Sequence, residues 1–211
     1  MKYVLKGLEP LEFSKWKGNE NENWKPEYSS MGSKLKNIIK ISLIKEQGFL
    51  CCYCQRRLYL NDSHIEHFNP QCKKEVDPLD YSNMLCSCQN QLESGEPRHC
   101  GNLKGDWYDS KLLVSPFNKD CENQFEFYGN GEIAPFGFEN TAAETTIEKL
   151  GLNIPKLIDL RKKAIEPFLE ENLDTQELKK FVKGYLKPDS DGKLGEFYTV
   201  IESLFMEYTW I

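Results

Sequence analysis

The chain has 211 residues, enough for one domain with a full hydrophobic core, which excludes a small scaffold that depends on disulfides. Hydrophobic residues make up 39% and charged residues 28%, and the apolar runs are only a few residues long, so we expect no membrane partner. The formal net charge of -6 argues against a protein that coats nucleic acid. No signal peptide is recognisable at the N-terminus, so we expect cytoplasmic localisation.

The charge is distributed unevenly along the chain. Between residues 34 and 75, eight basic residues stand against four acidic ones, which gives this segment a local excess of +4. Acidic residues are concentrated in the C-terminal half. A phosphate-binding face in the first half is therefore compatible with the acidic total.

The first half of the chain predicts an arm, a helix and a set of short elements. Residues 1–30 show no sustained period of 2 or 3.6, so we expect an irregular arm whose aromatic side chains pack on the core. Apolar residues recur at helical spacing over 33–47, and Gly48 follows where a C-terminal cap belongs, so we expect an amphipathic helix there. Between 49 and 107 we expect two short strands at 57–60 and 64–68, a long connection and a helix.

The second half predicts a hairpin followed by helices. Phe125-Glu126-Phe127-Tyr128 and Glu132-Ile133-Ala134 flank Gly129-Asn130-Gly131, a pattern typical of a β-hairpin. We expect helices over 141–150, from Pro155 onward with Asn153 as the N-cap, over 174–186 and over 196–210. A turn at 187–192 separates the last two.

Cysteine and histidine are concentrated in one segment of about fifty residues, which is typical of a metal site in a chain without an export signal. The cysteines of this segment are Cys51, Cys52, Cys54, Cys72, Cys86, Cys88 and Cys100, and the histidines are His64, His67 and His99. Cys51 and Cys54 form a Cys-x-x-Cys knuckle, which lets two thiolates of one turn bind a single tetrahedral ion.

The preferred ligands of a structural Zn²⁺ are Cys51, Cys54, Cys88 and Cys100. Cys86 or His99 could replace one of them. Two other interpretations are reduced core cysteines, since free cysteine behaves as a small hydrophobe, and a redox pair of Cys51 and Cys54. The redox interpretation is disfavoured because a turn, and no helix, is expected after the knuckle.

The segment Ser63-His64-Ile65-Glu66-His67-Phe68-Asn69-Pro70 carries the densest set of reactive side chains. In an extended strand, His64 and Glu66 share one face and His67 lies on the other, but a strand end can bring Glu66 and His67 to one cleft. A carboxylate that binds a divalent ion beside a neutral histidine that acts as a base suits phosphodiester hydrolysis. The alternative is a structural histidine pair.

The order of motifs adds a family resemblance. Cys-x-x-Cys, Ile-Glu-His-Phe-x-Pro, Tyr-Ser-Asn-Met-Leu-x-x-Cys and Cys-Gly-Asn-x-Lys-Gly-Asp together resemble the zinc-bearing HNH endonuclease family. The resemblance implies an α+β fold with a ββα-metal (HNH, or His-Me finger) core, surrounding helices and a small hairpin. It implies Glu66 as a ligand of the catalytic ion, His67 as the general base and Asn83 as the residue that orients the base through backbone contacts.

The last motif departs from the usual family pattern. The family has an asparagine directly after the second zinc cysteine, whereas Gly101 stands there in this chain and Asn102 comes one residue later. Asn102 is the expected second ligand of the catalytic ion, with Asn90 as the alternative. We expect Lys104 to contact phosphate, and His64 to contact the scissile phosphate or to orient a neighbour.

A wider resemblance covers residues 30–165 and suggests a biological setting. Ser115-Pro116-Phe117-Asn118, Phe125-Glu126-Phe127 and the segment from Thr146 to Asn153 are similar to PtuB-like subunits of Septu-type and retron-associated anti-phage defence systems. The resemblance implies a PtuA-like ATPase as partner and nucleic acid as substrate, with DNA favoured and tRNA as a second candidate. Mg²⁺ is the expected catalytic ion, with Mn²⁺ as the alternative.

These features divide the chain into three parts and leave two functions open. We expect an N-terminal arm at 1–30, a zinc-stabilised HNH nuclease core at 31–120, and a hairpin and helical region at 121–211 that docks a partner. The favoured function is a metal-dependent endonuclease. The alternative is a zinc-binding module that contacts nucleic acid or protein without catalysing a reaction.

Overall fold

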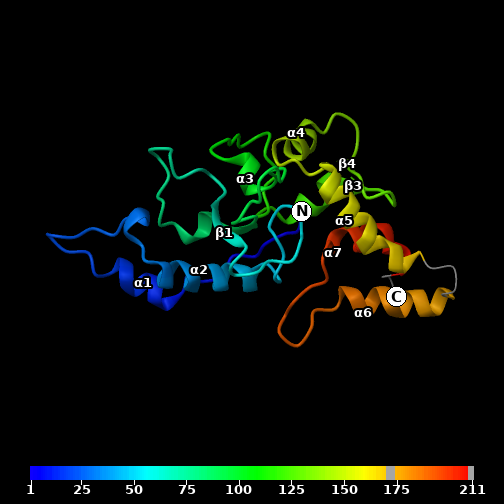
Figure 1. The fold of residues 1–211 in the computed structure, drawn as a ribbon, viewed down its shortest axis with the longest axis horizontal. Coiled ribbons are helices and arrows are strands. Elements are labelled where there is room, and N and C mark those ends of the chain that lie inside the picture. The colour runs from blue at the N-terminus through cyan, green and yellow to red at the C-terminus, as the bar shows by residue number, and fades with distance from the viewer. Residues whose placement is uncertain (170–173, 209–211) are drawn as a thin grey trace.

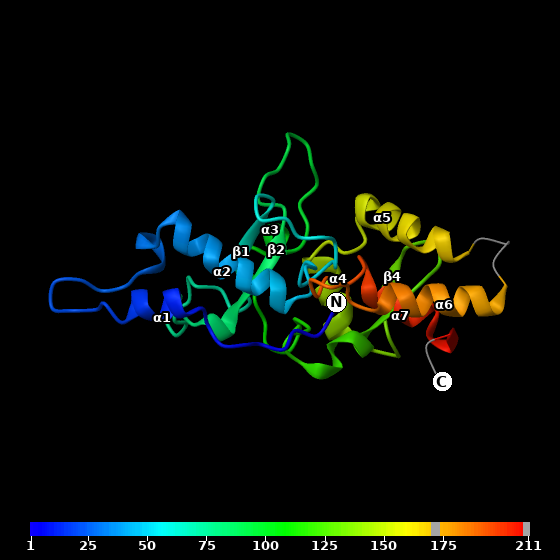
Figure 2. The same ribbon diagram turned by 90° about the horizontal axis from the view of Figure 1, so that it is seen from below.

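The computed structural model describes residues 1–169 and 174–208. The molecule is elongated: helices α1 (Leu11–Lys17) and α2 (Ser33–Glu46) lie at one end and α6 (Thr175–Leu186) lies at the other (Figures 1 and 2). The sheet of β1 (Ser63–His67) and β2 (Met84–Cys88) lies between them. Within the described ranges, no helix combines the length and apolar character needed to span a bilayer.

Helix α2 confirms the prediction for residues 33–47. Ile39, Leu43 and Ile44 are buried on one face because apolar residues recur at helical spacing. Gly48 follows the helix end with φ 60°, a conformation that glycine adopts at little steric cost. The buried side chain of Gln47 donates to the carbonyl oxygens of Leu50 and Cys86 and accepts from the amide of Cys86, so it ties the end of α2 to β2.

The N-terminal arm is more ordered than its sequence predicts. It contains α1 and the short 3-10 helix η1 (Tyr28–Ser30). Helix α1 has seven residues and buries only Phe13, so it is too short to produce a recognisable helical period. The arm packs along α2, where the ammonium of Lys6 lies 2.7 Å from the carboxylate of Glu46.

The central sheet is an antiparallel pair in which His64 lies opposite Ser87 and Glu66 opposite Leu85. The strand expected at 64–68 is confirmed within one residue, but the strand expected at 57–60 is absent. Arg57 makes only an isolated bridge to Leu50, because its backbone amide donates to Glu196 from the C-terminal region. The pairing strand is β2, which follows the 3-10 helix η2 (Tyr81–Asn83).

Helix α3 (Gly101–Lys104) follows β2 after a long loop and lies against the sheet. The backbone amide of Gly101 donates to Ser87 Oγ at 3.1 Å. On β2, Ser87 lies opposite His64, so α3 approaches the strand face that carries His64.

The predicted hairpin is confirmed: β3 (Phe125–Phe127) follows η3 (Lys119–Gln124) and pairs antiparallel with β4 (Ile133–Pro135). Helices α4 (Thr141–Lys149) and α5 (Pro155–Ile165) follow, as expected. Asn153, however, does not cap α5, whose N-cap is Ile154. Its side chain instead exchanges two hydrogen bonds with the backbone of Ile133 in the hairpin. The amide group expected to cap α5 therefore binds β4.

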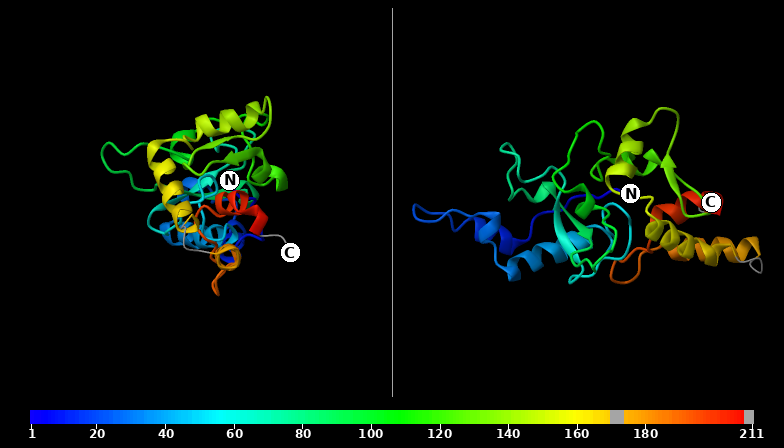
Figure 3. Two further views of the ribbon diagram at one scale, coloured as in Figure 1. Left: turned by 90° about the vertical axis from the view of Figure 1, so that its right-hand side faces the viewer. Right: turned by 45° about the horizontal axis from the view of Figure 1, so that its top comes forward.

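The C-terminal helices carry an aromatic cluster whose buried members are part of the hydrophobic core of the molecule. The cluster consists of Phe168 in η4 (Glu166–Phe168), Phe181, Tyr185 and Phe205. Helix α7 (Tyr198–Leu204) and η5 (Met206–Tyr208) are shorter than the helix expected over 196–210, whose last two residues lie outside the described ranges. Helix α7 lies beside the hairpin (Figure 3).

Candidate functional site

Four buried cysteines from three segments of the chain converge on one point. Cys51 and Cys54 come from the loop after α2, Cys88 ends β2, and Cys100 precedes α3. Their sulfur atoms all lie within 4.8 Å of one another, and those of Cys54 and Cys88 are 3.7 Å apart. Tetrahedral Zn–S bonds of about 2.3 Å place ligand sulfurs about 3.8 Å apart. The cluster therefore fits a zinc ion, and it contains the four cysteines that the sequence favours.

The electrostatics of the cluster also suit a cation. Burial alone would raise the pKa of the thiols, but hydrogen bonding from Cys100 and its neighbours outweighs burial at two of them. The pKa of Cys51 lies well below its usual value and that of Cys54 falls to about 7, whereas burial and the neighbouring thiols hold the pKa values of Cys88 and Cys100 well above theirs. Thiolates are the form of cysteine that binds metal.

The two alternative ligands lie outside this set of four. His99 is fully buried beside it, with Nδ1 3.1 Å from the sulfur of Cys100 and 3.8 Å from that of Cys88. An imidazole N–H at this place can donate to ligand thiolates. Burial raises the pKa of Cys86 to about 12, so its thiol is protonated at neutral pH.

Glu66 lies on β1 with its two carboxylate oxygens in different surroundings. Oε1 accepts a hydrogen bond from the Tyr53 hydroxyl at 3.0 Å and lies 2.8 Å from the ammonium of Lys104. Oε2 lies 3.7 Å from Nε2 of His64. Burial would raise the pKa of Glu66, but His64 and the charge of Lys104 hold it below its usual range. The carboxylate is thus ionised although only 8% of its side chain is exposed.

His67, at the end of β1, is held in one orientation. Its ring packs edge-on against Tyr28 with centroids 4.9 Å apart, and Nε2 lies 3.0 Å from the carbonyl oxygen of Pro78. A carbonyl oxygen only accepts hydrogen bonds, so in the neutral ring Nε2 carries the proton and Nδ1 carries the lone pair. Burial lowers the pKa of His67, which favours the neutral ring.

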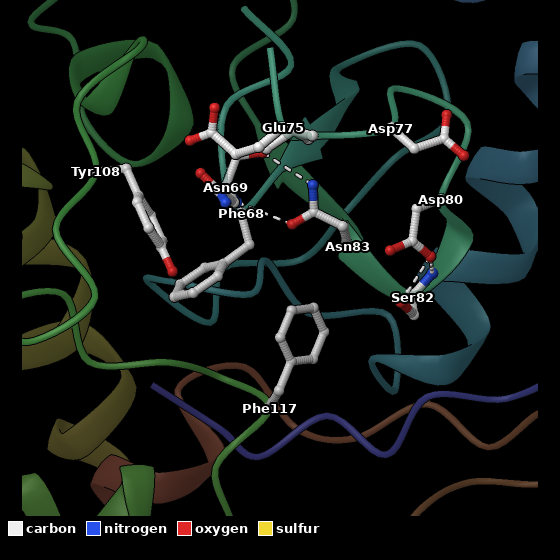
Figure 4. A pocket seen from close by; sticks show the side chains of 10 residues that line it. Phe68, Asn69, Glu75, Asp77, Asp80, Ser82, Asn83, Tyr108 and Phe117 are labelled. Carbon is white, nitrogen blue, oxygen red and sulfur yellow. Dashed lines mark hydrogen bonds between the residues drawn. The ribbon is translucent and has the colours of Figure 1, made fainter. Parts of the chain in front are cut away.

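Asn83 fastens the loop that follows His67. Its Nδ2 donates to the carbonyl oxygen of Asn69 at 2.8 Å, and its Oδ1 accepts from the backbone amide of Asn69 at 2.9 Å (Figure 4). Phe68, between His67 and Asn69, also donates its backbone amide to the carbonyl oxygen of Asn83 at 3.0 Å. These bonds fix the course of the backbone next to His67.

Two hollows adjoin this strand. The one drawn in Figure 4, of about 330 Å³, is lined by Asn69, Asn83 and the exposed carboxylates of Glu75, Asp77 and Asp80. The other, of about 300 Å³, is lined by His64, Tyr28, Lys36, Asn37, Lys40 and Asn90, among others, and we call it the α2 hollow. Tyr28 connects the α2 hollow to the ring of His67.

The remaining sequence-predicted residues occupy different positions. The Nδ2 of Asn102 donates to the carbonyl oxygen of Gln89, and the exposed Asn90 donates to the carbonyl oxygen of Asn61. Lys104, expected to contact phosphate, is buried with its ammonium against Glu66 and the carbonyl oxygen of His67. Its position on α3 directs it inward, so it supports the carboxylate.

Sequence reasoning missed Tyr53 and the role of Gly101. Tyr53 lies between the two knuckle cysteines, so the zinc loop itself presents its hydroxyl to Glu66. A Cβ at Gly101 would collide with Glu66 Oε2 and lie 2.7 Å from His64 Nε2. The absence of a side chain at 101 is the one signal that could have indicated this close approach.

Comparison with known proteins gives one informative relative. No family model matches the chain. A curated protein of Vibrio cholerae serotype O1 biovar El Tor, named "Retron Vc95 putative HNH endonuclease", is 34% identical over 139 residues. The match covers 63% of this chain and 65% of that protein, so the chain spans slightly less than two thirds of the relative's length.

Proposed function

We propose that this chain is a metal-dependent HNH endonuclease that hydrolyses phosphodiester bonds of nucleic acid, with DNA as the favoured substrate. The observation that carries the proposal is the pairing of an ionised, buried Glu66 with the neighbouring His67, whose ring is oriented with Nδ1 as the basic nitrogen. The name of the Vibrio cholerae relative supports the same activity.

The proposed catalytic core is a ββα-metal unit within residues 31–120. Strands β1 and β2 and helix α3 supply its parts, and the Cys51, Cys54, Cys88 and Cys100 cluster supplies a structural Zn²⁺ site at the junction of β2 and α3. A site closed by four thiolates has no open position for substrate, so its role is structural. The arm at 1–30 and the region at 121–211 surround this core.

The residues have distinct roles in hydrolysis. His67 Nδ1 accepts a proton from the attacking water, while the Pro78 carbonyl holds the ring and Asn83 holds the backbone beyond it. Glu66 would hold a divalent ion, Mg²⁺ or Mn²⁺, and Asn102 stays a predicted second ligand. Such an ion supplies charge stabilisation to the phosphate oxygens.

The test is cleavage of plasmid DNA and bulk tRNA by purified protein, with zinc content measured in each sample. We expect wild type to cut one substrate only when Mg²⁺ or Mn²⁺ is added, and His67→Ala to lose cleavage at least 100-fold with zinc unchanged. Equal cleavage by both proteins would remove His67 from the mechanism. A zinc-loaded protein that binds nucleic acid and never cuts it would favour the non-catalytic module.

We further propose that the nuclease acts with a PtuA-like ATPase in a Septu-type or retron-associated anti-phage system. The relative's name includes a retron, and the net charge of -6 disfavours unaided binding to a polyanion. The proposed docking surface lies in 121–211, where the exposed Phe181 lines a hollow on α6.

Docking is tested by co-purification with the ATPase. Phe181→Ser is expected to reduce the amount of ATPase recovered, with circular dichroism to check the fold because Phe181 also stacks on Phe168. Phe138→Ser, at a 93% exposed phenylalanine outside α6, is the control for loss of an exposed ring. Equal recovery with both variants would exclude α6 as the docking surface.

A further inference from the structure

The two carboxylate oxygens of Glu66 differ in how many hydrogen-bond donors they contact. Oε1 receives the Tyr53 hydroxyl and the Lys104 ammonium, whereas Oε2 accepts no hydrogen bond from the described residues and faces His64 and Gly101. A carboxylate oxygen that no protein group bonds is left to water or to a cation. Oε2 is therefore the oxygen available to an ion.

His64 presents a second ligand atom at the same point. Its Nε2 lies 3.7 Å from Glu66 Oε2, which is too far for a hydrogen bond. Two ligands at about 2.1 Å from one ion are separated by about 3.0 Å at a right angle and by about 3.5 Å at a tetrahedral angle. A small rotation of either side chain brings the pair to that separation.

Gly101 keeps this point clear of protein atoms. A Cβ at position 101 would collide with Oε2 and crowd Nε2, so a larger residue there would push the Glu66 and His64 side chains out of their present positions. The next residue, Asn102, has its Nδ2 engaged with the Gln89 carbonyl oxygen. His64 thus offers a ring nitrogen beside the free oxygen of Glu66.

Substrate can reach this pair from the α2 hollow. His64 has 23% of its side chain exposed and lines that hollow together with Lys36 and Lys40. Lys36 suits the phosphates that flank a scissile bond, whereas the ammonium of Lys40 donates to the carbonyl oxygens of Leu60 and Ser63. Tyr28 joins the same hollow to the ring of His67, so the proposed base borders it as well.

We infer that His64 Nε2 and Glu66 Oε2 together hold the catalytic divalent ion, with His64 in the place expected for Asn102. Imidazole nitrogen favours Mn²⁺ and later transition ions over Mg²⁺, so the site is selective for Mn²⁺ over Mg²⁺. The inference rests on the proposed function only in taking Glu66 as a ligand.

Mn²⁺ binding to the zinc-loaded chain, without substrate, tests the inference. Titration followed by electron paramagnetic resonance should show at least tenfold weaker binding in His64→Ala, and less than twofold change in Asn37→Ala, a control in the same hollow. The electron spin-echo spectrum of bound Mn²⁺ should show nitrogen coupling in wild type and His67→Ala, and none in His64→Asn. Zinc content and circular dichroism check folding.

The outcomes separate the inference from the proposed function. Loss of Mn²⁺ binding in Glu66→Gln, with affinity and nitrogen coupling unchanged in His64→Ala, would overturn the inference while leaving the nuclease proposal intact. Loss of affinity in Asn102→Ala alone would return the ligand role to that residue and also overturn it. If Glu66→Gln binds Mn²⁺ as wild type does, both the inference and the metal role of Glu66 fail.

Discussion

The buried charge of Glu66 is sustained by a small set of side chains from three parts of the chain. Tyr53 comes from the zinc loop, His64 from the same strand and Lys104 from α3. An ion pair this deeply buried contributes little net stability compared with apolar residues, yet removing one partner leaves the other charge uncompensated. The pair is best explained as a means of keeping the carboxylate ionised inside the molecule.

Lys104→Met is therefore expected to destabilise the protein strongly. The Lys104 side chain is 1% exposed and its ammonium lies 2.8 Å from Glu66 Oε1, so the loss of this ammonium should lower the free energy of unfolding by about 3–5 kcal/mol. Lys149→Met, which removes an exposed pair with Glu148, should change it by less than about 1 kcal/mol. Urea unfolding of wild type and the two variants measures both values. Equal effects would show that the buried Lys104 ammonium stabilises the protein no more than an exposed one does.

Zinc retention should distinguish cysteines of the cluster from other buried cysteines. Cys54→Ser removes one of four converging thiolates, so we expect elemental analysis to show most of the zinc lost together with the cooperative unfolding transition. Cys86→Ala, two residues before the cluster residue Cys88 on β2 and outside the cluster, should keep about one zinc per chain. Full zinc in Cys54→Ser would contradict the assignment.

Among the elements, the connection between η2 and the end of β1 controls the geometry around His67. Asn83 makes two side-chain hydrogen bonds to the backbone of Asn69, a ring that neither serine nor alanine can form. The clamp joins the residues before β2 to the loop after β1. The orientation of His67 thus depends on a contact between segments that are separated in sequence.

Asn83→Ala should release this loop. Loss of both bonds is expected to cost about 1–3 kcal/mol and to raise hydrogen exchange at the amide of Asn69, with cleavage reduced more than tenfold because the base is no longer fixed. Asn83→Asp keeps the acceptor for Asn69 and should show a smaller effect. Asn90→Ala, at an exposed amide, is the control for exchange, and equal exchange in both alanine variants would exclude the clamp.

Local signals predicted the elements that are held by their own sequence. The helix at 33–47 and the hairpin around 129–131 follow from apolar spacing and turn residues, and both are present. The wrong predictions, the strand at 57–60 and the Asn153 cap, fail because of tertiary contacts. The amide of Arg57 donates to Glu196, and the side chain of Asn153 bonds the backbone of Ile133. No local pattern contains information about those distant partners.

The candidate site divides in the same way. Cysteine spacing selected four residues that do converge, because two knuckle thiolates require a second pair nearby. The inward position of Lys104 and the closeness of Gly101 to Glu66 depend on how α3 lies against β1. These contacts are set by packing between elements, which the sequence pattern does not encode directly.

At the scale of the whole molecule, the C-terminal region is joined to the Cys-rich loop. Gln55, directly after Cys54, receives the backbone amide of Phe197 on its carbonyl at 3.0 Å and that of Thr199 on its side chain at 2.9 Å. Its own Nε2 donates to the Thr199 hydroxyl. Deleting the C-terminal region to test partner docking would therefore also disturb the zinc loop, and surface substitutions on α6 avoid this problem.

This link predicts that a residue in α7 controls zinc retention. Thr199→Val leaves the buried Nε2 of Gln55 without its acceptor, at a cost of about 1–2 kcal/mol next to a zinc ligand. Zinc release to a colourimetric chelator should become roughly 5–30 times faster, if that cost falls on the closed loop. Ser203→Ala, exposed on the same helix, should release zinc at the wild-type rate. Identical rates in both variants would mean that the zinc loop holds its shape without the C-terminal helices.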